Sequence, residues 1–134
     1  MSQIIYVTGN DLKFKVAVQA LKNSTISLER ATLDVPEIQN SNVEEIAKWS
    51  AIWACQKLGQ PVVVMDVGYY IEALKGFPGP FIKYVNERFT SEDFLKLMGG
   101  KSNRQIVIRD CLAYCCPNKK PKVFSQLHLG EIAA

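Results

Sequence analysis

The stretch PVVVMDVGYYIEALKGFPGP, which runs from Pro61 to Pro80, decides the fold class. It opens with a continuous apolar run, the pattern of a strand that is covered on both faces, as in a parallel sheet between helices. The run stops at a carboxylate, Asp66, and we expect the strand to end there. The loop Gly76–Pro80 follows, stiff at its prolines and free in φ at its glycines.

Strand and helix patterns alternate before this stretch. The β-branched run Ile4–Val7 predicts a first strand, and the turn Thr8–Asn10 leads into a helix that begins at Asp11. A second strand is predicted next. The next helix is predicted to start at a capping box formed by Ser41 and Glu44. Its inward stripe is small and apolar apart from one serine, and consists of Val43, Ala47, Ser50, Ala54 and Leu58.

The second half predicts two short helices and a hairpin. One helix is expected over Ile82–Phe89, and Thr90 is placed to cap another. A long strand over Arg104–Cys116, a turn, and a returning strand over Lys122–Leu129 make a C-terminal β-hairpin. The order of patterns predicts an α/β fold with a mixed central sheet flanked by helices.

Length and composition indicate an ordinary globular protein. A chain of 134 residues suits a single domain over 1–134, and such a domain can bury about 60–70% of its extended surface. The net charge of +3 fits an anionic ligand and is too weak to indicate nucleic-acid binding. No apolar run is long enough to cross a membrane, and the start QIIYVTGN lacks the features of a signal peptide, so we expect no membrane partner and a cytoplasmic location.

The segment TGNDLK is a candidate anion site. A glycine turn between a strand and a helix leaves unpaired N–H groups at the helix start, where the helix dipole also attracts anions. Thr8 and Asn10 add side-chain donors, and Lys13 adds a positive charge. The segment does not match the P-loop pattern. The alternative interpretation is that Asn10 only caps the helix and that Lys13 is a solvated surface residue.

Two acids and a second lysine are further candidates. A carboxylate at the carboxyl end of a parallel-type strand, as predicted for Asp66, can hold Mg²⁺ or take a proton from an attacking water. A second acid should converge on it, and Glu37 is the best candidate. Lys83 follows the rigid loop and suits phosphate clamping as well as it suits a plain surface turn. The alternative is that Asp66 caps a turn and Glu37 is exposed.

Three segments together resemble one family. In order and spacing, TGNDLK, LDVPEIQ and VMDVG…IEALKGFPGPFIKYV resemble the inosine triphosphate pyrophosphatase family, also called the Ham1 family. The resemblance implies an α/β fold and Mg²⁺-dependent hydrolysis of inosine and xanthosine triphosphates, or their deoxy forms, to the monophosphate and pyrophosphate. It also implies that two copies form a homodimer.

The resemblance also implies roles for single residues. Asp66 matches the aspartate that acts as general base or metal ligand, and Glu37 matches a metal position after a proline. The residues that match substrate-binding positions are Thr8, Gly9, Asn10, Lys13 and Lys83. The sequence therefore predicts a purine nucleoside triphosphate as the partner and Mg²⁺ as the cofactor.

The chain departs from the family pattern inside the predicted site. Met65 stands where the family usually has an acid, Val67 where it has Thr or Ser, and Ser50 where a lysine is common. The family also continues with a Phe-Gly-Tyr-Asp-Pro-like segment and a Ser-His-Arg motif, so we expect this chain to lack the family's C-terminal part. These departures favour an alternative: a catalytically weak or inactive member that binds a nucleotide or a partner. A third reading is a structural piece whose exposed sheet edge pairs with another copy.

Overall fold

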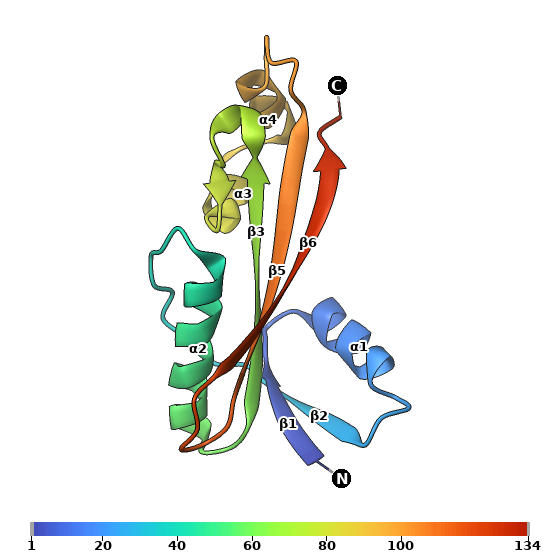
Figure 1. The fold of residues 1–134 in the computed structure, drawn as a ribbon, viewed down its shortest axis with the longest axis vertical. Helices are drawn as coiled ribbons and strands as arrows, with labels where there is room; N and C mark the ends of the chain where they lie inside the picture. The colour runs from blue at the N-terminus through green and yellow to red at the C-terminus, as the bar shows by residue number, and fades with distance from the viewer. Residues whose placement is uncertain (1, 134) are drawn as a thin grey trace.

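The computed structural model describes residues 2–133, which form a six-stranded mixed sheet with helices (Figure 1). The strands are β1 (Ser2–Val7), β2 (Ile26–Ala31), β3 (Val62–Ile71), β4 (Pro78–Gly79), β5 (Gln105–Cys115) and β6 (Lys122–Glu131). The helices are α1 (Asp11–Ala20), α2 (Val43–Leu58), the 3₁₀ turn η1 (Glu72–Leu74), α3 (Ile82–Arg88) and α4 (Ser91–Leu97). This arrangement confirms the predicted α/β fold with a mixed sheet and a β5–β6 hairpin.

The pairing of β3 determines where the sheet leaves room for a site. The strand order is β2-β1-β3-β5-β6, with β1 parallel to both of its neighbours and β5 antiparallel to β3 and β6. The register between β1 and β3 covers only Ile5↔Val62 and Tyr6↔Val63. On its other edge, β3 pairs with β5 over its whole length, as far as Ile71. Beyond Val63, therefore, β1 leaves one edge of β3 open until β4 pairs with β3 at Tyr69 and Tyr70.

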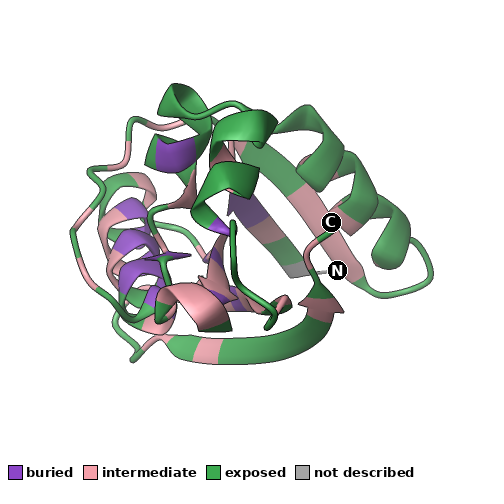
Figure 2. Ribbon diagram, turned by 90° about the horizontal axis from the view of Figure 1, so that it is seen from above, coloured by how far each residue is buried: buried purple, intermediate pink, exposed green. Residues whose placement is uncertain are grey.

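Helix α2 packs on one face of the sheet and builds the core with it. Val43, Ala47 and Ala54 of the predicted stripe are fully buried, and Ser50 is 6% exposed. They meet side chains of β1, β3 and β5 that alternate toward this face, including Ile5, Val7, Val62, Val64, Cys111 and Ala113. Figure 2 shows buried residues gathered along this helix. The stripe predicted from the sequence therefore faces the sheet and forms part of the core.

The two helix caps had different outcomes. The Thr90 cap is confirmed: Thr90 and Asp93 form a reciprocal capping box, and the Thr90 hydrogen bonds lower the pKa of Asp93. The prediction of a Ser41–Glu44 capping box is wrong. The N-cap of α2 is Asn42, whose side chain accepts a hydrogen bond from the Glu44 N–H at 3.0 Å. Asparagine caps a helix as well as serine does, so the Ser41–Glu44 pattern did not exclude a cap one residue later.

Helix α1 lies on the face of the sheet opposite α2. Tyr6, which alternates with the core residues of β1, meets the ring of Phe14 edge to face at a centroid distance of 6.4 Å. The helix contains no buried residue, and its apolar Leu12 and Val16 are 70% and 61% exposed. The apolar spacing of the sequence correctly predicted a helix here, but in the described chain its apolar face does not build a core. Within residues 2–133, no helix combines the length and apolarity needed to cross a membrane.

Candidate functional site

A cleft of about 1110 Å³ lies where β3 extends beyond β1. Its walls come from the loop after β1, the loop between β2 and α2, and the start of α3. The structure brings all of the sequence-predicted site residues to this cleft: Thr8, Gly9, Asn10, Lys13, Glu37, Asp66 and Lys83 line it together.

Asp66 reaches the cleft from an unexpected place in the strand. We predicted that the strand ends at Asp66, and this is wrong, because β3 continues to Ile71 and Asp66 pairs with Cys111 of β5 in mid-strand. The pairing of β3 with β5 continues past the apolar run, so the strand does not end where the sequence becomes polar. What ends near Asp66 is the pairing with β1. The alternative that Asp66 caps a turn is therefore wrong as well.

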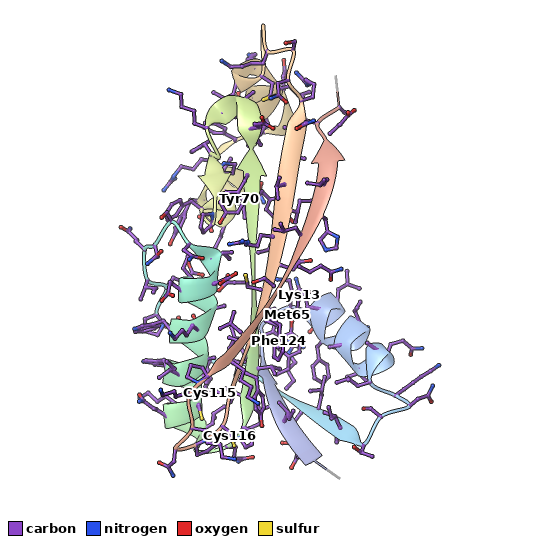
Figure 3. The ribbon with its side chains drawn as sticks, in the orientation of Figure 1. Lys13, Met65, Tyr70, Cys115, Cys116 and Phe124 are labelled. Atoms are coloured by element: carbon purple, nitrogen blue, oxygen red, sulfur yellow. The ribbon has the colours of Figure 1, made fainter. Side chains whose placement is uncertain are left out.

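The neighbours of Asp66 give it unusual acid–base chemistry. Burial raises the pKa of Asp66 to about 6, with Lys13 lowering the pKa and Glu37 raising it further. The three charged groups therefore interact across the cleft. A carboxyl group with a pKa near 6 is largely ionised at neutral pH and can still accept a proton, as a general base must. Met65, the residue before it, also lines the cleft, as does Lys13; both are labelled in Figure 3.

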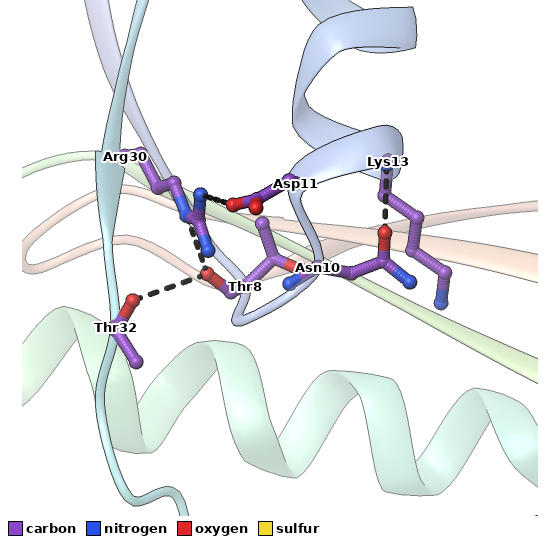
Figure 4. A network of polar contacts seen from close by, with 6 residues as sticks. All are labelled: Thr8, Asn10, Asp11, Lys13, Arg30 and Thr32. Carbon is purple, nitrogen blue, oxygen red and sulfur yellow. Dashed lines mark hydrogen bonds and ion pairs between the residues drawn. The ribbon is translucent and has the colours of Figure 1, made fainter.

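The turn after β1 is held in place by hydrogen bonds (Figure 4). The Asn10 Oδ1 accepts the Lys13 N–H at 3.0 Å, and the Thr8 Oγ1 accepts the Asn10 N–H at 3.1 Å. Behind the turn, Arg30 donates from Nε to the Thr8 carbonyl at 3.1 Å and pairs with Asp11. The interpretation of Asn10 as a helix cap is thus confirmed, and the same residue also lines the cleft.

Glu37 is held by two neighbouring residues of α3. The Lys83 ammonium lies 3.5 Å from the Glu37 Oε1, and the Tyr84 hydroxyl donates to the Glu37 Oε2 at 3.2 Å. The Glu37 side chain is 50% exposed, as the alternative interpretation of an exposed Glu37 predicted, yet it lies in the cleft. The loop after β2 and the start of α3 are joined by these two contacts.

The rigid loop before α3 supports one wall. Gly76 and Gly79 have φ of 91° and 58°, a region that favours glycine. A Cβ at Gly79 would come within 3.3 Å of the Tyr70 ring, so the loop lies directly against β3. The Tyr70 hydroxyl in turn donates to the Ser41 carbonyl at 3.4 Å, close to the start of α2. Pro80, the last residue of this loop, and Phe81 after it line the cleft.

Sequence reasoning missed several residues of the cleft. Asn86 and Glu87 line it and follow Lys83 by three and four positions, so the helix predicted over this segment could have found them on the same face. Tyr84 carried no such signal, because its partner Glu37 lies 47 positions away in the sequence.

The acids of the cleft fit a cation that is shared with phosphate. The lining contains four carboxylates (Asp34, Glu37, Asp66 and Glu87) against two lysines (Lys13 and Lys83). Within residues 2–133, no group of three or more His, Cys, Asp or Glu side chains could hold a metal ion by itself. Mg²⁺ usually takes one or two carboxylates together with substrate phosphates, and Glu37 with Asp66 fits that donor set. Met65 adds no charge to it.

Comparisons with known proteins agree on one family. The sequence model described as the Ham1 family matches residues 4–134. The dITP/XTP pyrophosphatase of Methanopyrus kandleri is 41% identical over 131 residues, which cover 98% of this chain and 70% of the relative. The dITP/XTP pyrophosphatase of Methanosarcina mazei is 38% identical over 133 residues, covering 99% of this chain and 72% of the relative.

Solved structures show the same fold. The structure of a HAM1 protein from Coxiella burnetii superposes with a TM-score of 0.85 at 25% identity, covering 99% of this chain and 74% of that one. The Staphylococcus aureus Ham1 protein superposes with a TM-score of 0.83 at 23% identity, covering 98% and 72% of the two chains.

Proposed function

This chain belongs to the Ham1 family, and on that premise we propose that it hydrolyses non-standard purine nucleoside triphosphates to the monophosphate and pyrophosphate. Inosine, deoxyinosine and xanthosine triphosphates are the proposed substrates, in keeping with the names of its relatives. The strongest support is the cleft itself, in which a half-buried carboxylate with a pKa of about 6 interacts with Lys13 and Glu37.

Four charged residues of the cleft have parts in the proposed reaction. Asp66 accepts the proton of the water that attacks the α-phosphorus, and the bond from that phosphorus to the bridging oxygen breaks to release pyrophosphate. Lys13 and Lys83 bind the phosphates, with the N–H groups of the turn after β1. Glu37 and Asp66 would hold Mg²⁺, which when bound supplies positive charge to the triphosphate.

Product analysis tests this function. Purified protein is incubated with Mg²⁺ and inosine, deoxyinosine or xanthosine triphosphate, and separately with ATP and GTP. We expect one pyrophosphate and one monophosphate per turnover, with a higher kcat/KM for the first group. Release of orthophosphate instead, or equal rates with ATP, would contradict the proposal.

Specific residues support a second candidate, a nucleotide- or partner-binding protein with weak or no catalysis. Ser50 lines the cleft and is only 6% exposed, at a position where the family commonly has a lysine. Met65 brings an uncharged side chain to the cleft where the family usually has an acid. Titration calorimetry with inosine triphosphate separates the candidates: binding without product formation supports the second.

We also propose that two copies form a homodimer through β6. This strand ends the sheet order, and its Phe124, Leu127 and Leu129 are 59%, 56% and 84% exposed. An apolar strand at a sheet edge favours pairing with another copy. Size-exclusion chromatography with light scattering should give twice the 15.0 kDa of one chain. Leu127→Lys should shift the protein to monomer, and Leu95→Lys on α4 should not; a monomeric unmodified protein would refute the pairing.

A further inference from the structure

Both oxygens of the Glu37 carboxylate have a partner in the structure. Oε1 faces the Lys83 ammonium at 3.5 Å, and Oε2 accepts a hydrogen bond from the Tyr84 hydroxyl at 3.2 Å. Both partners belong to the first turn of α3, whereas Glu37 comes from the loop before α2. An acid to which the family resemblance assigns a metal role is thus already engaged by a positive charge.

The Lys83 and Tyr84 contacts have different effects on the binding of a cation to Glu37. The Lys83 and Glu37 side chains are 62% and 50% exposed, and an ion pair of such exposed groups is weak and easily exchanged. A lysine ammonium at this carboxylate also repels a divalent cation that seeks the same oxygen. The Tyr84 hydroxyl is neutral and binds the other oxygen, so its hydrogen bond can persist while Oε1 changes partner.

We propose that Lys83 and a divalent cation compete for Glu37, and that Tyr84 is a positioning residue that keeps Glu37 turned into the cleft during the exchange. The phosphates of the nucleotide draw Lys83 away from Glu37 and free its Oε1 for the cation. Cation and nucleotide therefore bind better together than alone. This deepens the proposed function and rests on it only for the identity of the nucleotide.

The exchange predicts opposite effects of one substitution on two ligands. Lys83→Met removes the competitor, so Mn²⁺ alone should bind this variant about three- to fivefold more tightly than it binds the unmodified protein. A gain in affinity of about this size is expected from the loss of an exposed ion pair. The same variant should bind inosine triphosphate less tightly in EDTA, because it lacks the ammonium that the phosphates recruit. Lys83→Arg keeps the charge and should restore both affinities.

Electron paramagnetic resonance of free Mn²⁺ measures the first affinity without nucleotide, and calorimetry in EDTA measures the second. Lys119→Met, in the β5–β6 turn, removes the same charge outside the cleft and should leave both affinities unchanged. Tyr84→Phe in the Lys83→Met background should weaken Mn²⁺ binding two- to threefold, since a hydrogen bond to Glu37 is lost. Unchanged or weaker Mn²⁺ binding by Lys83→Met would overturn the exchange. An unmodified protein that releases no pyrophosphate would overturn only the proposed function.

Discussion

Asp66→Asn should lower the kcat of pyrophosphate release from inosine triphosphate by at least about a hundredfold. The amide has the shape of the carboxylate but cannot accept the proton of the attacking water. Asp66 is the carboxylate of the cleft whose pKa is raised to about 6, which suits proton transfer at neutral pH. Steady-state rates with saturating Mg²⁺ give kcat. Calorimetry in EDTA, where the metal role of Asp66 plays no part, should show that the nucleotide still binds within a few fold.

Asp110→Asn is a matched control for this loss. Asp110 lies on β5, is paired with His128 and does not line the cleft, so the same chemical change there should leave kcat nearly unchanged. If Asp66→Asn keeps more than about a tenth of the rate, another group accepts the proton. The carboxylates of Glu37 and Glu87, which share the cleft, would then be the next to test.

The same substitution should stabilise the metal-free protein at alkaline pH. Burial raises the pKa of Asp66 from its ordinary 3.8 to about 6, so the folded chain holds this proton more tightly than the unfolded chain does. Stability is therefore lost as the pH rises through about 4 to 6, and the cost is complete above that window. A shift of this size in a partly exposed group corresponds to about 2 kcal/mol, which Asp66→Asn should recover at pH 8.

Urea denaturation in EDTA at pH 4, 6 and 8 measures this effect. The free energy of unfolding of Asp66→Asn should exceed that of the unmodified protein at pH 8, by less at pH 6 and by almost nothing at pH 4. A destabilised Asp66→Asn at pH 8 would mean that partners such as Lys13 outweigh the burial of the charge.

Local patterns predicted the elements of the fold for a physical reason. The inward stripe of α2 appears in the sequence because a helix repeats every 3.6 residues, and the β5–β6 hairpin appears because strand side chains alternate. The Thr90 cap is a contact between residues three positions apart, so the chain carries it locally. Such features were confirmed, while the cap of α2 lies at Asn42, one residue after the predicted Ser41.

The sequence by itself determined which residues could carry the chemistry, because the acids, lysines and glycine turn are properties of the chain. Only the tertiary structure decided how they meet. Asp66 lies in mid-strand because β5 pairs beyond the apolar run, and it borders the cleft because β1 stops pairing two residues into β3. Glu37 meets Lys83 and Tyr84 across more than forty positions. Contacts of that range depend on how the sheet and helices pack, and no local periodicity records them.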